Sequence, residues 1–242
     1  PPPDKNSNTA VILAGLYPVK SMERLNMASR ELLPVDRFTF SPLLLEKVIR
    51  FRRTHDQARL YSRTAYELPQ CHFGLMHTAG FFADTSFVDV VKFCCRLEAF
   101  QAAECLANDD MPGAVEAVGY LLRGAELLSH EQHVICRIEA TRLRKLGLSV
   151  VEAIVHDAEL DVPSVTRLHG LLAGQLDRWP HDARAWIGDR ALGLHTYEAI
   201  RGGDMIWLLT DQEVQELAAE LNLSVFEAAA LREIDDDETF YL

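Results

Sequence analysis

The sequence contains no long apolar run. Its most apolar stretches, Leu43–Leu45 and Val90–Cys95, are short and are bounded or interrupted by charged residues. A membrane-spanning helix needs roughly 18 to 20 consecutive apolar residues, so we expect no transmembrane segment. Asn-Gly and Asp-Gly hairpin turns and alternating β-branched runs are also absent, which argues against a β-sheet protein.

The motifs that identify several enzyme classes are missing as well. There is no glycine-rich phosphate loop, no Gly-x-Gly-x-x-Gly, no Gly-x-Ser-x-Gly and no His-Glu-x-x-His. The cysteines are few and odd in number, with no Cys-x-x-Cys pair: Cys71, Cys94, Cys95, Cys105 and Cys136. We therefore predict no cofactor, no bound metal and no disulfide framework, and the sequence favours a non-enzymatic role.

The composition is typical of a folded protein, and charge is unevenly distributed along the chain. The 242 residues are 48% hydrophobic and 25% charged, which excludes wholesale disorder. The net charge is −12, yet Pro1–Arg63 carries a net +5 and Gly202–Leu242 a net −10. This balance disfavours nucleic acid as a ligand. It predicts complementary surfaces, either within one chain or between the two copies of a homodimer.

The chain begins with a polar, proline-rich stretch, and its first residue is Pro rather than Met. We expect residues 1–8 to form a disordered tail left by processing or truncation. Removal of a signal peptide is one explanation, which favours an exported or periplasmic protein over a cytoplasmic one.

Helix-start signals are frequent. Ser or Thr followed three residues later by Glu or Gln can cap a helix, and this pattern occurs at Thr54/Gln57, Ser129/Gln132 and Ser149/Glu152. Four prolines precede apolar-periodic runs, where a missing N–H costs nothing: Pro42, Pro112, Pro163 and Pro180. The signals predict an all-α protein of stacked antiparallel helical hairpins, either α-solenoid-like or an irregular helical bundle.

We expect one helical domain over residues 9–234, followed by an acidic tail at residues 235–242. Apolar periodicity predicts helices at 8–33 with a break at Pro18, 42–53, 55–68, 86–107, 113–128, 130–146, 149–158, 163–178, 182–201, 211–221 and 224–234.

The middle of the chain contains an internal repeat. Cys95-Arg96-Leu97-Glu98-Ala99 recurs 41 residues later as Cys136-Arg137-Ile138-Glu139-Ala140, and Val115–Val118 recurs 36 residues later as Val151–Ile154. Two helical hairpins stacked in register, with a core at about 86–158, would produce this pattern.

The stretch Leu106–Ala117, with Ala114 as the small residue that opens the second helix, resembles the middle turn of a tetratricopeptide-type hairpin. The sequence lacks that family's Trp-x-x-Leu-Gly-x-x-Tyr signature and its 34-residue period. The resemblance covers residues 86–158 at most and implies helical-hairpin stacking and a protein-binding scaffold.

The strongest candidate for irregular structure is the segment 69–85, which contains Cys71, His72 and His77. Long ordered loops often carry function, and an imidazole with a thiol can form a metal site or a nucleophile pair. The alternative is an apolar loop that folds back onto the core, with its histidines bonded to backbone.

Three other groups of residues are candidate sites. His130, His133 and Cys136 share helical spacing, although nothing identifies further metal ligands, and solvated histidines are the simpler interpretation. A basic cluster indicates either contact with an acidic partner or phosphate, or a solvated helix face; it contains Lys47, Arg50, Arg52, Arg53 and Arg59. Arg96 and Arg137, equivalent in the repeat, are candidate contacts of a binding groove, the alternative being intramolecular ion pairs.

These observations support two hypotheses. The first is a non-enzymatic protein whose helical hairpins present a groove to a peptide or protein partner. The second is a small-molecule-binding or hydrolytic helical domain with a pocket under the 69–85 loop. The sequence favours the first.

Overall fold

The computed structural model describes residues 8–16, 19–34, 37–68, 71–157 and 160–202, and within these ranges every regular element is a helix. The all-α prediction is therefore confirmed. The elements are α1 (Thr9–Ala14), α2 (Val19–Glu31), α3 (Pro42–Thr54), α4 (Asp56–Tyr66), the 3₁₀ helix η1 (His77–Phe82), α5 (Phe87–Ala107), α6 (Met111–Ser129), α7 (Val134–Asp157), α8 (Val162–Arg178) and α9 (Ala183–Arg201). None of the described helices is long and apolar enough to cross a membrane.

The chain divides into two compact units. Unit 1 comprises residues 1–73, 85–131 and 135–182, and unit 2 comprises residues 74–84, 132–134 and 183–242. The predicted helices 211–221 and 224–234 and both predicted tails, apart from Asn8, lie outside the described residues. The assignment of residues 9–234 to one domain stays a prediction.

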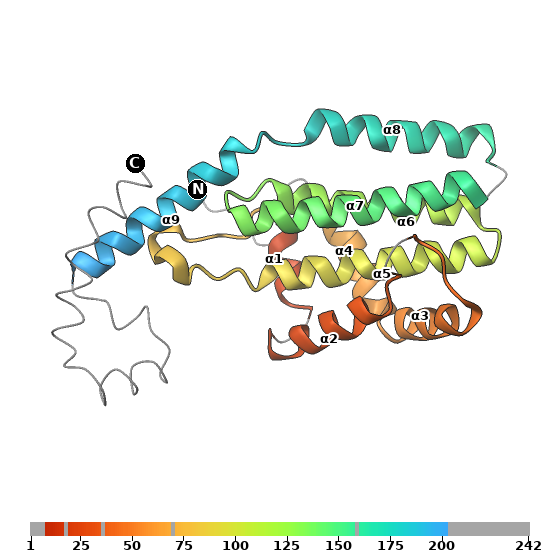
Figure 1. The fold of residues 1–242 in the computed structure, drawn as a ribbon, viewed down its shortest axis with the longest axis horizontal. Coiled ribbons are helices and arrows are strands. Elements are labelled where there is room, and N and C mark those ends of the chain that lie inside the picture. Colours follow the sequence, from red (N-terminus) through yellow and green to blue (C-terminus); the bar gives the residue numbers. More distant parts are fainter. Residues whose placement is uncertain (1–7, 17–18, 35–36, 69–70, 158–159, 203–242) are drawn as a thin grey trace. The chain divides into compact units, whose positions relative to one another are not determined.

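The core of unit 1 is the hairpin of α5 and α6, which lie side by side in Figure 1. The turn between them requires a left-handed residue, Asp109, with φ 57°. Asp110 then caps α6, because its carboxylate accepts a hydrogen bond from the Gly113 N–H at 3.0 Å. Phe93 and Phe100 of α5 and Leu121 of α6 are fully buried, so the hairpin forms the apolar interior of the unit.

The helix α7 corrects one expectation, because the predicted helices 130–146 and 149–158 are a single helix. Ser149 does not cap a new helix; its hydroxyl donates back to the Leu146 carbonyl at 2.7 Å. Gly147, two residues before Ser149, has a packing role, since a Cβ there would lie 2.7 Å from a methyl group of Leu122 on α6. The second copy of the repeat is thus carried by one helix, whereas the first copy spans α5 and α6.

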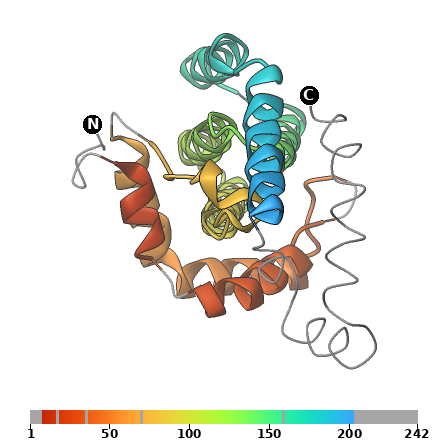
Figure 2. The ribbon, with the colours of Figure 1, turned by 90° about the vertical axis from the view of Figure 1, so that its left-hand side faces the viewer.

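The helices α2 and α3 cover α5, and Figure 2 shows them beside α5 on the side away from α8. Val48 of α3 and Met22 of α2 are buried in this layer. The Arg96 guanidinium of α5 fixes α2 by donating to the Asn26 carbonyl and side-chain oxygens at 3.0 and 2.8 Å. The opposite faces of α2 and α3 remain exposed, and this placement creates the site described below.

In unit 2, η1 packs against α9. The approach is close: Gly80, with φ 57°, would place a Cβ 2.3 Å from the Thr196 hydroxyl of α9. Only glycine combines this backbone conformation with so near a neighbour.

Candidate functional site

Backbone groups of His72 and Phe73 hold the segment after α4 in place through hydrogen bonds to side chains. The Asn8 side chain donates to the His72 carbonyl and accepts from the His72 N–H, both at 2.9 Å. The Phe73 N–H donates to Glu131 at 3.0 Å, and the Phe73 ring stacks on Phe87 with centroids 4.3 Å apart. The His72 side chain itself is 60% exposed.

The Cys71 thiol is not activated as a nucleophile. Burial, together with the nearby charge of Glu131, raises the pKa of Cys71 to about 12. Burial likewise raises the pKa values of Cys94 and Cys136 to about 12, and all five cysteines are free. Thiols with such pKa values are protonated at neutral pH and behave as buried apolar groups.

In unit 2, His77 Nε2 lies 3.2 Å from the Gln132 carbonyl oxygen. His133, whose pKa is lowered by burial, lies 3.9 Å from Asp189. Within the described part of the chain, no group of three His, Cys, Asp or Glu side chains is placed to hold a metal ion.

Both arginines of the repeat bind their own chain. Besides its bonds to Asn26, Arg96 donates to the Ser29 hydroxyl at 3.1 Å. Arg137 donates to Asp182 and to the Pro180 carbonyl, each at 2.6 Å, and its guanidinium lies 4.6 Å from the Trp179 ring centroid. These contacts give each side chain an intramolecular role, and binding to a partner stays a prediction for both.

Most of the predicted basic cluster is neutralised inside unit 1. Arg52 and Arg53 pair with Glu104, and Arg52 also pairs with Asp56. The chain of ion pairs continues from Asp56 through Arg59 to Glu98. It ends at Arg63, which bridges Glu98 at 2.7 Å and Glu116 at 2.8 Å. Four arginines thus meet four carboxylates, and Lys47 and Arg50 are left outside this network.

These two cations line a groove between α2 and α3, which is the best candidate site that the structure offers. Two adjoining pockets, with volumes of about 990 and 410 Å³, share Ala28 and Glu31 and are open to solvent. Neither these nor a third pocket of about 320 Å³ between residues 37–39 and α7 is lined by His72 or His77. We call the pair of pockets the α2–α3 groove.

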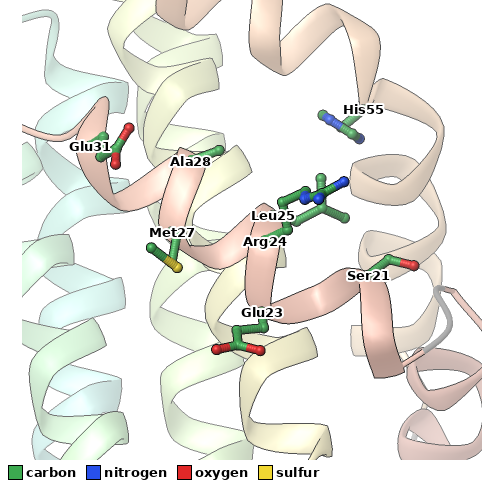
Figure 3. Close-up of a pocket in the computed structure, with 8 residues that line it drawn as sticks. All are labelled: Ser21, Glu23, Arg24, Leu25, Met27, Ala28, Glu31 and His55. Atoms are coloured by element: carbon green, nitrogen blue, oxygen red, sulfur yellow. The ribbon is translucent and has the colours of Figure 1, made fainter.

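Residues of both helices form the walls of the α2–α3 groove. From α2 and the residue that follows it come Ser21, Glu23, Arg24, Leu25, Met27, Ala28, Glu31 and Leu32, and from α3 come Lys47, Arg50, Phe51 and Thr54. Figure 3 shows Arg24 and Ala28 on the side of α2 that faces His55, whereas Glu23 and Met27 point to the other side.

His55 closes one end of the groove at the junction of α3 and α4. Its ring contacts the rings of Phe51 and Phe93, with centroids 4.7 and 5.3 Å away. Burial lowers the pKa of His55 from its ordinary value of 6.5, so the ring is uncharged at neutral pH. The fixed positive charge of the groove therefore comes from Arg24, Lys47 and Arg50.

Lys47 and Arg50 belong to the basic cluster that stands out in the sequence, whereas the α2 residues of the groove were not predicted. The spacing of Ser21, Arg24, Ala28 and Glu31 places them on one helical face, a detectable signal. That this face meets α3 depends on the docking of both helices on α5, which no local pattern reveals.

Comparisons with protein-family models, with curated proteins and with solved structures give no match to this chain. The resemblance of residues 86–158 to tetratricopeptide-type hairpins stays a prediction.

Proposed function

We propose that the protein is a non-enzymatic interaction protein that binds a peptide or protein segment along the α2–α3 groove. The observation that carries the proposal is the open groove itself, which combines apolar side chains, Leu25, Leu32 and Phe51, with exposed charge. Grooves between helices that mix an apolar floor with a charged rim are typical of peptide recognition.

The second hypothesis, a ligand pocket under the 69–85 loop, receives less support. Its thiol is protonated at neutral pH, and neither of its histidines lines a described pocket.

The test uses a photo-crosslinking amino acid at Ala28 in the full-length protein expressed in its own cells. A crosslinked partner is identified by mass spectrometry, purified, and measured for binding to the wild type and to Ala28→Trp, which fills the groove. The matched control is Ala173→Trp on α8, at a similarly half-exposed alanine.

We expect Ala28→Trp to weaken binding at least about tenfold and Ala173→Trp to leave it unchanged. Equal affinity of the two variants, or crosslinking that yields no partner, would overturn the assignment of the groove.

A further inference from the structure

A further pocket of unit 1 shares no lining residue with the α2–α3 groove. It lies where the connection between α2 and α3 meets α7 (Figure 1), and its volume is about 320 Å³. The lining residues are Arg37, Phe38 and Thr39 of the connection and Ser149, Glu152, Ala153 and His156 of α7. The α7 residues are three, one and three positions apart, so they share one face of the helix. We call this cavity the α7 pocket.

The α7 pocket combines an apolar floor with a charged rim. Phe38 and Ala153 are buried, and the Phe38 ring packs edge-on against Phe40, with centroids 4.9 Å apart. Arg37 and Glu152, by contrast, are exposed. An apolar lining with a few polar groups that fix orientation is typical of small-molecule sites.

The rim of the α7 pocket contains two opposite charges that do not pair with each other. The Arg37 guanidinium and the Glu152 carboxylate line the same cavity, yet they lie beyond ion-pair distance. Within the described part of the chain, neither side chain has another ion-pair or hydrogen-bond partner. Elsewhere on α7 opposite charges do meet, as Arg142 pairs with Glu139. The α7 pocket thus presents a cation and an anion that are both available to a ligand.

The other polar groups give the α7 pocket a direction. The Ser149 hydroxyl donates to the Leu146 carbonyl at 2.7 Å, so towards the pocket its oxygen can only accept. The α7 wall therefore offers acceptors from Ser149 and Glu152, whereas the opposite wall offers the N–H donors of Arg37. A ligand ammonium group fits the first wall, and a ligand carboxylate fits the second.

We propose that the α7 pocket binds a free α-amino acid, whose ammonium group faces Glu152 and Ser149 and whose carboxylate faces Arg37. A simple anion would meet the like charge of Glu152, and a simple cation would meet that of Arg37, so a zwitterion is the ligand class that satisfies both. The apolar floor receives the side chain of the ligand. A volume of about 320 Å³ is at the lower end of the range for small-molecule sites, which suits a ligand of this size.

This site is separate from the α2–α3 groove and does not depend on the function proposed for that groove. The experiment is isothermal titration calorimetry of the full-length protein with the standard free L-amino acids. The tightest binder is then compared with its amide, which keeps only the positive charge, and with its N-acetyl derivative, which keeps only the negative charge.

The variants are Glu152→Gln and Arg37→Gln, each of which removes one charge at an exposed position. The matched controls on α8 are Asp177→Asn and Arg167→Gln, since both side chains are exposed and neither lines the α7 pocket. Circular dichroism checks that all four variants are folded. The variant Ala28→Trp should bind the amino acid as the wild type does, which separates this test from that of the groove.

We expect each blocked derivative to bind the wild type at least about tenfold more weakly than the free amino acid. Glu152→Gln should bind the amino acid more weakly and no longer discriminate against the N-acetyl derivative. Arg37→Gln should bind it more weakly and no longer discriminate against the amide. Both control variants should retain the affinity and the discrimination of the wild type.

Three results would overturn the proposal. The first is that no amino acid binds at millimolar concentration. The second is that one blocked derivative binds as tightly as the free amino acid, which would make the ligand a simple cation or a simple anion. The third is that Glu152→Gln and Arg37→Gln bind the amino acid as the wild type does, which would place its site elsewhere.

Discussion

At the scale of residues, unit 1 depends on a few buried charges whose partners come from distant parts of the chain. Glu98 is fully buried on α5 and accepts two hydrogen bonds from Arg63, 35 residues away. Removing one member of such a pair leaves its partner charged in an apolar environment, which costs far more than losing a surface pair.

Glu98→Gln should therefore destabilise the protein by about 3 kcal/mol or more. The matched change Glu46→Gln, at an exposed pair with Arg50, should cost no more than about 0.5 kcal/mol. Urea denaturation followed by circular dichroism gives both free energies of unfolding. Similar values for the two variants would contradict the role assigned to Glu98.

At the scale of elements, two helical glycines differ in whether the neighbouring atoms leave room for a side chain. A Cβ at Gly188 of α9 would lie 1.8 Å from the Gln132 carbonyl oxygen, so only glycine allows this approach within unit 2. A Cβ at Gly170 of α8 would meet nothing within 4 Å. Gly170 therefore lowers helix stability without a packing benefit in the described structure.

We expect Gly170→Ala to stabilise the protein by up to about 1 kcal/mol. Gly188→Ala should destabilise it by about 1 to 3 kcal/mol, because the backbone of Gln132 must move. Hydrogen exchange of residues 183–201 locates the second effect in α9. Unchanged exchange there in Gly188→Ala would refute the close approach.

The element scale also shows what the sequence can and cannot predict. Pro42, Pro112 and Pro163 correctly mark helix starts, where Ser41, Asp110 and Asp161 act as caps. Caps and prolines act over three or four residues, so the sequence contains the whole interaction.

The Ser/Thr capping-box patterns predict helix starts less reliably than the prolines do. Thr54 and Ser129 resemble the first residues of capping boxes, yet their hydroxyls donate to the carbonyls of Arg50 and Glu126 in the preceding turn. A Ser or Thr hydroxyl near a helix end can either donate to a carbonyl of the preceding turn or cap the next helix. The position of the next helix decides which of the two it does.

At the scale of the molecule, the candidate site could be predicted only in part. Lys47 and Arg50 stand out in the sequence as members of a basic cluster of five residues. Three of the five form ion pairs with carboxylates such as Glu104, some 50 residues away along the chain. Only the packing of α3 and α4 on α5 shows which cations pair with carboxylates of α5 and which stay at the surface.

The same network makes the stability of the whole chain depend on pH. Burial alone would raise the pKa values of Glu104 and Asp56, but hydrogen bonds from arginines outweigh it and hold both pKa values below their ordinary range. Depressed carboxyl pKa values stabilise the fold above the unfolded pKa, near 4, and this contribution is lost as the pH falls below it. Glu98, whose pKa burial raises, acts in the opposite direction.

The urea midpoint of the wild type should consequently fall between pH 6 and pH 3. In Glu104→Gln, which cannot ionise at this position, the fall should be smaller although the variant is less stable at pH 6. A pH dependence identical to that of the wild type would show that Glu104 contributes nothing to it.

The raised pKa values of the cysteines have a practical consequence for following how the protein opens. Cys94 and Cys95 have no exposed surface, so an alkylating reagent reaches them only when α5 separates from its neighbours. The rate at which such a reagent modifies Cys95 then measures how often the interior of unit 1 opens, and modification of Cys71, which is only half-buried, reports separately on the segment that follows α4.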